Sequence, residues 1–203
     1  VKTMLLAQGA RENGFQLTSE DLEERLQELI NEAGGTEAYI SWLTTYGYTD
    51  ASFRQQLTLE LEAEAMRRII FDNVPTTQPH VEAHDFLFAD EYSAQRILDQ
   101  FENGVEYEVV VVNNDPNSDG YMGWFPRGYL FDLSIEEAAF STEAPGYYGT
   151  VIANDIGYHV IFVLDTDPSR EVSPNALLEL KEQALLDWLE EKIAQSSIEI
   201  LLP

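Results

Sequence analysis

The spacing of apolar residues changes twice along the chain, and this change limits the possible folds more than any other feature. From Thr18 to about Phe71, apolar residues recur at helical spacing while acidic residues fill the other faces. Thr18 or Ser19 can cap the first of these helices, and Gly34-Gly35 can end it. The N-terminal part is therefore predicted to be a set of amphipathic helices.

The middle of the chain has a different pattern. It begins after the segment 74–79, where two prolines interrupt the helical spacing as they do in linkers. The pattern predicts a strand at 80–88, a helix at 94–101, a β-rich segment at 107–112, a short helix at 135–140 and a strand at 158–163. This mixture indicates a small α/β unit.

The last part of the chain is again predicted to be helical. Ser173 can act as an N-cap, with Pro174 at the first helical position, and a broad apolar stripe follows. Such a stripe needs a partner, as do the N-terminal helices, so we expect both ends to pack together around an inserted middle domain. Trp42 and Trp188 lie on these stripes and are interpreted as core residues.

Composition excludes several classes of protein. The chain has 11 basic and 37 acidic residues, a formal charge of −26, which disfavours nucleic acid as a partner. The chain has no cysteine, which excludes disulfides, thiolate metal sites and thiol nucleophiles. No apolar run is long enough to predict a membrane span.

Two of the three histidines, His84 and His159, lie in predicted strands. Histidines in that setting are most often buried and hydrogen-bonded. Because residues alternate along a strand, His80, Glu82 and His84 would share one face, with a spacing that a metal site could use. No fourth ligand is evident, and we favour a surface position for His80.

The segment 115–120 could form a second kind of metal site, a calcium-binding loop. Its acidic and amide residues, followed by Gly120, fit the first half of an EF-hand calcium loop. The twelfth position is Pro126, where such a loop needs a glutamate, and the flanking segments are not paired helices. We therefore favour an ordinary turn.

Five segments, in the same order, resemble the parvulin family of peptidyl-prolyl isomerases. They are Ala83-His84-Asp85-Phe86-Leu87 for an A-x-H-I-L strand, Ser93 to Gly104 for the next helix, Gly120-Tyr121-Met122-Gly123-Trp124-Phe125 for the G-G-D-L-G-W-F turn, Ile135 to Phe140 for the F-E-x-A-x-F helix, and Gly157-Tyr158-His159-Val160-Ile161 for the G-Y-H-I-I strand. Together they extend over about 80 residues.

The flanking segments look like the helical chaperone module of SurA- and PrsA-type extracytoplasmic foldases. Leu5-Leu6-Ala7-Gln8, Gly14-Phe15, the 19–30 helix, the 38–43 segment and Phe53 to Leu57 carry this likeness. The resemblance implies an α+β fold: a small antiparallel sheet with surrounding helices, inserted into an all-helical domain made of both chain ends. The implied domains are residues 1–78, residues 79–170 and a C-terminal helix within 171–203. It also implies that a leader and the start of the first helix precede Val1 in the full protein.

The resemblance also implies site residues. The implied catalytic residues are His84, Asp115 and His159, with the two imidazoles hydrogen-bonded to each other on the floor of the sheet. The implied substrate-binding residues are Met122, Phe125, Leu130 and Ile135. Three positions depart from the family: Ile135 replaces a usual Phe, the valines at 109–112 stand in place of a short helix, and Asn154 replaces a usual Thr or Ser.

Two functions follow from the resemblance. The first is a bacterial extracytoplasmic foldase, anchored outside this segment or secreted, that isomerises X–Pro bonds in exported polypeptides and binds them while they are unfolded. The alternative is a holdase with a non-catalytic parvulin domain. Neither function implies a metal or cofactor, because isomerisation breaks no bond.

Overall fold

The computed structural model describes residues 1–196, and these form two compact units. The first unit contains residues 1–74 and 181–196, and the second contains residues 75–180. The boundaries therefore lie at 74/75 and 180/181, against the 78/79 and 170/171 expected from the sequence. The roles assigned to the three parts stay predictions.

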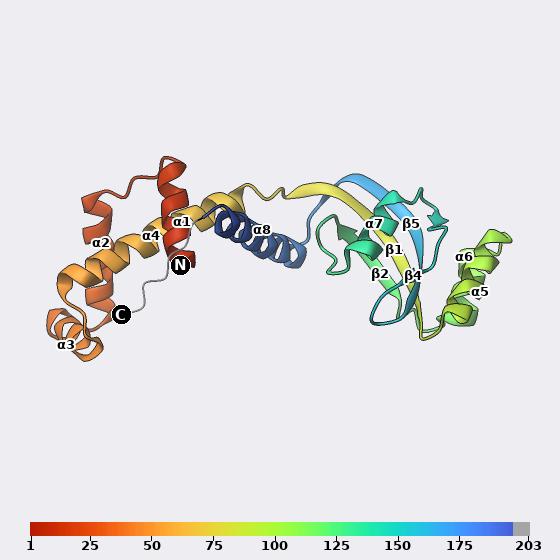
Figure 1. Ribbon diagram of the computed structural model, residues 1–203, viewed down its shortest axis with the longest axis horizontal. Coiled ribbons are helices and arrows are strands. Elements are labelled where there is room, and N and C mark those ends of the chain that lie inside the picture. Colours follow the sequence, from red (N-terminus) through yellow and green to blue (C-terminus); the bar gives the residue numbers. More distant parts are fainter. Residues whose placement is uncertain (197–203) are drawn as a thin grey trace. The chain divides into compact units, whose positions relative to one another are not determined.

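The first unit is helical (Figure 1). Its helices are α1 (Lys2–Glu12), α2 (Ser19–Glu32), α3 (Thr36–Tyr46), α4 (Asp50–Asp72) and the second half of α8 (Pro174–Gln195). Thr18 and Thr49 form capping boxes at the starts of α2 and α4, and Gly47 ends α3 in the left-handed conformation. In the described part of the chain, no helix is long and apolar enough to cross a membrane.

Two apolar clusters hold this unit together. The first joins α1, α4 and α8 through Leu6, Met66 and Leu189, and the second joins α2, α3 and α4 around Leu26 and Leu57. The Trp188 ring lies directly on the backbone of α1, because a Cβ placed on Gly9 would come within 2.5 Å of that ring. The C-terminal helix thus packs against the N-terminal helices at a position where α1 has no side chain.

The second unit is built on an antiparallel sheet with the strand order β2-β1-β5-β3, and β4 also pairs with β5. The strands are β1 (Thr77–Phe88), β2 (Tyr121–Pro126), β3 (Gly146–Tyr147), β4 (Ile152–Ala153) and β5 (Tyr158–Glu171). β1 begins inside the segment that the sequence suggested as a linker. Its pairing with β5 is irregular between Gln78 and His80, where Pro79 has no N–H to donate.

Helices cover both faces of this sheet. On one face, α7 (Leu133–Ser141) packs on Ala83, Phe125 and Ile161. On the other face, α5 (Glu91–Glu102) and α6 (Tyr107–Asn114) pack on Phe86 and Val160. Ile161 and Val160 are neighbours in β5, so the two cores are separated by the alternation of side chains along one strand.

Helix α6 corrects the prediction of a β-rich segment at 107–112. β-Branched residues lose only a few tenths of a kcal/mol in a helix, so packing decides the outcome. Val110 is fully buried against α5 and the sheet, whereas Val109 and Val112 are exposed. One buried position in a short run of valines suits a helical turn, because a central strand would bury them on both faces.

Candidate active site

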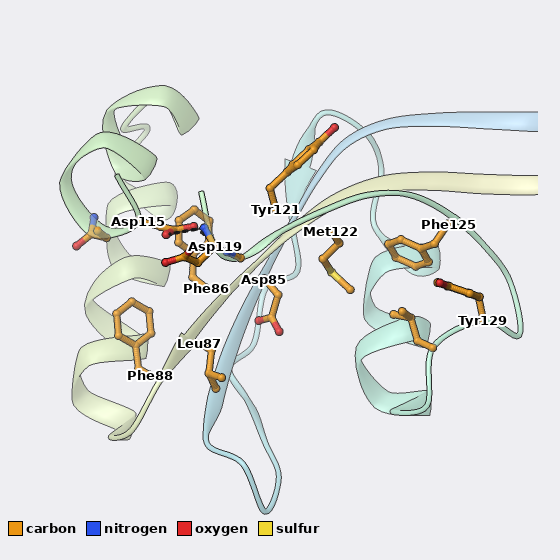
Figure 2. Close-up of a pocket in the computed structure, with 13 residues that line it drawn as sticks. Asp85, Phe86, Leu87, Phe88, Asp115, Asp119, Tyr121, Met122, Phe125 and Tyr129 are labelled. Carbon is orange, nitrogen blue, oxygen red and sulfur yellow. Dashed lines mark hydrogen bonds between the residues drawn. The ribbon is translucent and has the colours of Figure 1, made fainter. Parts of the chain in front are cut away.

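A pocket of about 650 Å³ opens beside β1 and β2 in the second unit. The lining residues are Asp85, Phe86, Leu87, Phe88, Asn114, Asp115, Asp119, Gly120, Tyr121, Met122, Phe125, Tyr129 and Leu130. In Figure 2 the side chains of Met122, Phe125 and Tyr129 lie at one end and those of Asp115 and Asp119 at the other, with Asp85 between them.

The apolar end contains three of the four predicted substrate-binding residues. Phe125 is only 1% exposed and lies at its base, whereas Met122 and Leu130 are half-buried and pack against the core formed with α7. Ile135 does not line the pocket. It lies inside that core and supports Met122 and Leu130 from behind.

The loop that carries Leu130 is held by a buried carboxylate. Glu136, on α7, accepts hydrogen bonds from the backbone N–H of Gly128 at 2.9 Å and of Leu130 at 3.1 Å. Gly128 has a positive φ of 83°, which favours glycine at the turn. Glu136 therefore fixes a wall of the pocket without contacting its interior, a role that the sequence analysis missed.

On the α7 face of the sheet, Asp85 and His159 form a hydrogen-bonded pair. Asp85 Oδ2 lies 2.7 Å from His159 Nδ1, and His159 Nε2 lies 3.0 Å from Asn154 Oδ1. The Asn154 oxygen also accepts the backbone N–H of Ile156 and Gly157, so Nε2 is the donor to it. One further proton then lies between Asp85 and Nδ1.

This pair continues into a chain of hydrogen bonds that ends at α7. Asn154 Nδ2 donates to Asp132 Oδ2 at 2.7 Å, and Asp132 Oδ1 caps the start of α7. Hydrogen bonds from Ser134 and Asn154 lower the pKa of Asp132 to about 2. The position that departs from the family pattern, Asn154, thus connects the histidine to the helix N-cap.

His84 lies on the other face of the sheet. The register of β1 against β5 pairs His84 with Phe162, Asp85 with Ile161, Phe86 with Val160 and Leu87 with His159. Because neighbouring side chains point to opposite faces, His84 and His159 are separated by the sheet. The prediction that the two imidazoles bond to each other is therefore wrong, and Asp85 occupies the position beside His159.

His84 has partners of its own. Its ring stacks on Phe86, its Nδ1 lies 2.9 Å from the Tyr107 hydroxyl, and its Nε2 lies 2.8 Å from Asp115 Oδ2, out of line for a good hydrogen bond. The structure thus brings together two of the three predicted catalytic residues, His84 and Asp115, and places His159 apart from them.

Asp115 holds the turn before β2. Its carboxylate accepts the backbone N–H of Asp119 at 3.0 Å and of Gly120 at 2.9 Å, four and five residues along the chain, so its oxygens serve the loop itself. His80 is buried, so the surface position expected for it is wrong, and its Nδ1 contacts the carbonyl oxygen of Gln78. Across residues 1–196, no group of three or more His, Cys, Asp or Glu side chains is placed to hold a metal ion.

Burial shifts the two central titratable groups in opposite directions. It lowers the pKa of His84, whose side chain is inaccessible to solvent, although Asp115 acts in the other direction. It raises the pKa of Asp85, although the hydrogen bond from His159 opposes this. At neutral pH His84 is therefore uncharged.

The sequence did contain a signal for Asp85. In the A-x-H-I-L pattern the histidine is the third residue, and the third residue of Ala83-His84-Asp85-Phe86-Leu87 is Asp85. Matching by residue type selected His84, whereas matching by position selects Asp85. The pocket residues Tyr129 and Asp119 gave no comparable signal.

A sheet covered by helices on both faces, together with a helical unit formed by the N-terminal helices and part of α8, is similar to the fold of PrsA-type peptidylprolyl isomerases. The chain superposes on the crystal structure of the peptidylprolyl isomerase PrsA from Bacillus cereus with a TM-score of 0.61, covering 98% of this chain and 82% of that one at 19% identity. For PrsA from Bacillus anthracis the TM-score is 0.53, covering 97% of both chains at 18% identity. These likenesses establish the fold.

A relative is also detected by sequence. The foldase protein PrsA of Halalkalibacterium halodurans is 27% identical over 144 residues, which cover 66% of this chain and 43% of that protein. The matched part is thus less than half the length of this relative. No family model matches the chain. The chain is similar to parvulin-type isomerases with a PrsA-like helical module, which confirms the resemblance inferred from its motifs.

Replacing Glu136 with Gln should release the loop that carries Leu130. An amide offers one acceptor oxygen where the carboxylate offers two, so we expect a loss of about 2 kcal/mol in the free energy of unfolding. Chemical denaturation followed by Trp124 fluorescence, in a background without the other tryptophans, measures this. The neighbouring Glu137→Gln is the control, because Glu137 is exposed and its salt bridge with Arg127 contributes little. Equal stability of the two variants would contradict the role of Glu136.

The His84 imidazole should titrate below its ordinary value of 6.5 in the folded protein. The unfolded chain then binds a proton near pH 6.5 that the folded chain does not, so the stability contributed by neutral His84 is complete above pH 6.5 and is lost as the pH falls. An NMR titration of the ring resonances, assigned with His84→Asn and compared with the chain in urea, measures the midpoint. A folded-state midpoint at or above that of the chain in urea would refute this prediction.

Proposed function

We propose that the chain acts as a foldase in which the second unit isomerises X–Pro bonds of unfolded polypeptides and the helical unit binds the same clients. The observation that carries this proposal is the open apolar pocket of Met122, Phe125 and Leu130, with a hydrogen-bonded Asp85–His159 pair on the same face of the sheet. The similarity to a foldase and to a peptidylprolyl isomerase supports it.

The proposed reaction makes modest demands on the protein. Rotation about the X–Pro amide crosses a barrier of ~18–20 kcal/mol and takes tens to hundreds of seconds without catalysis. A thousandfold acceleration needs only about 4 kcal/mol of transition-state stabilisation. No bond breaks and no proton has to be transferred, so a pocket of suitable shape and polarity is sufficient.

The pocket suits this task. Its apolar end can hold the proline ring against Phe125, which is removed from water, while the adjacent carbonyl turns out of conjugation. The twisted amide is less polar than the planar one, so a partly desolvated site favours it. In this proposal Asp85, held in place by His159, is the polar group nearest to the rotating bond. The role of His84 is structural, because its ring packs against Gly120 in the turn before β2.

The proposed clients are unfolded, proline-containing exported polypeptides. The proposed location is the extracytoplasmic side of a bacterial membrane, with any anchor outside this segment. Both follow from the likeness to PrsA. The strong negative charge of the chain keeps it soluble and apart from nucleic acids.

The isomerase proposal is tested by truncating a wall of the pocket. Leu130→Ala should lower kcat/KM for cis–trans exchange of Ala-Ala-Pro-Phe about ten-fold, equivalent to about 1.4 kcal/mol of lost contact. NMR exchange spectroscopy measures the rate. Leu178→Ala is the matched control, because Leu178 is exposed and lies outside the pocket. If the unmodified protein does not accelerate exchange, the isomerase proposal fails.

A holdase function remains the second candidate, and a surface of the helical unit favours it. Trp42, Tyr46 and Tyr48 form an aromatic patch at the end of α3, where Trp42 is 40% and Tyr46 64% exposed. The Trp42 ring stacks on Tyr48 at 5.9 Å and contacts the edge of Phe53. The interpretation of Trp42 as a core residue is thus wrong in part, because the residue packs on other aromatic rings and yet is 40% exposed.

Rigid aromatic rings exposed on one face suit the apolar side chains of unfolded clients. The double variant Trp42→Ala/Tyr46→Ala should therefore lose most of the ability to suppress aggregation of a reduced, unfolded test protein, as measured by light scattering. Tyr92→Ala removes an exposed tyrosine from α5 and is the control. If the unmodified protein suppresses aggregation but has no isomerase activity, only the holdase function is left. If the double variant suppresses aggregation as well as the unmodified protein does, the aromatic patch is not the client-binding surface.

A further inference from the structure

The lining of the pocket is asymmetric in charge. Three carboxylates line it, those of Asp85, Asp115 and Asp119, and no lysine, arginine or histidine does. Figure 2 shows Asp115 and Asp119 together at the end opposite Met122 and Phe125. A client bound with its proline at the apolar end would therefore present its neighbouring side chain to an acidic one.

The charges at this end are not neutralised by cations within the described chain. Asp115 is partly buried, but the backbone N–H groups of Gly120 and Asp119 keep the pKa of its carboxyl low, so it is ionised. The base beside it, His84, is buried and neutral. Asp119 is exposed, and no salt bridge within residues 1–196 involves it.

Asp85, the third carboxylate of the pocket, lies between the two ends (Figure 2). Its Oδ2 binds His159, whereas its Oδ1 has no hydrogen-bond partner among the described residues. That oxygen is buried, so the charge that a client side chain can approach belongs to Asp115 and Asp119.

We propose that the pocket selects prolines preceded by lysine or arginine. This specificity rests on the proposed isomerase function and assigns it a substrate class. The apolar end binds the pyrrolidine ring, and the preceding side chain, attached through the rotating bond itself, reaches Asp119 and Asp115. A glutamate in the same position would meet like charges, so the site discriminates against acidic X–Pro segments by repulsion as well as by attraction.

The test compares four peptides, Ala-X-Pro-Phe with X as Lys, Arg, Gln or Glu. We expect kcat/KM to be about ten-fold higher for Lys–Pro and Arg–Pro than for Glu–Pro at low ionic strength, with Gln–Pro between them, and the ratio to fall toward one in 1 M salt. Asp119→Asn should reduce the ratio of kcat/KM for Lys–Pro to kcat/KM for Glu–Pro several-fold. Glu102→Gln removes the same charge from an exposed position on α5 outside the pocket and should leave the ratio unchanged.

Equal ratios in Asp119→Asn and Glu102→Gln would show that only the overall charge of the protein acts, and would overturn the proposed pocket specificity. A ratio of one in the unmodified protein would also overturn it. Binding of the same peptides, followed by the amide resonances of Gly120 and Met122, separates this proposal from the isomerase function. Selective binding of Lys–Pro without catalysis would refute the isomerase alone, whereas equal binding of all four peptides would refute the specificity.

Discussion

The antiparallel pairing of β1 with β5 is the constraint on which the second unit depends. It places Leu87 opposite His159 and His84 opposite Phe162, and so decides which polar residues meet on each face. Because side chains alternate along a strand, a slip of one residue would exchange the two cores and both acid–histidine contacts. The α7 core, the α5–α6 core and the pocket between β1, β2 and the 127–130 loop all follow from this one register.

Most of the helices and strands could be predicted from the sequence, because local periodicity and capping residues determine them. The helices between Thr18 and Phe71, the strands around His84 and His159 and the short helix after Asp132 lie where their patterns indicate, whereas α1 was indicated only by the family resemblance. Helix α6 could not be predicted in this way. Its valines favour a strand locally, and only the contact of Val110 with α5 and the sheet reverses that preference.

Only some of the site residues were predicted, and there is a physical reason why the others were not. Met122, Phe125 and Leu130 lie close together in the sequence, so one turn and one strand bring them to the same pocket. The partner of His159 comes from a strand more than 70 residues earlier, and its identity depends on register, which residue type does not reveal. Glu136 was missed for a related reason, since a buried carboxylate on a helix resembles the exposed acids around it until the loop packs on it.

The contact between Asp85 and His159 also affects how this chain should be compared with others. A comparison that scores each position separately counts an aspartate beside the histidine as a mismatch, although the two residues form a hydrogen bond between the strands. Changing either residue alone would leave the other as a buried polar group without its hydrogen-bond partner. We therefore expect the two positions to change together in related sequences or to stay the same. Searches that score the two positions jointly should therefore find distant members of this fold that single-column comparisons overlook.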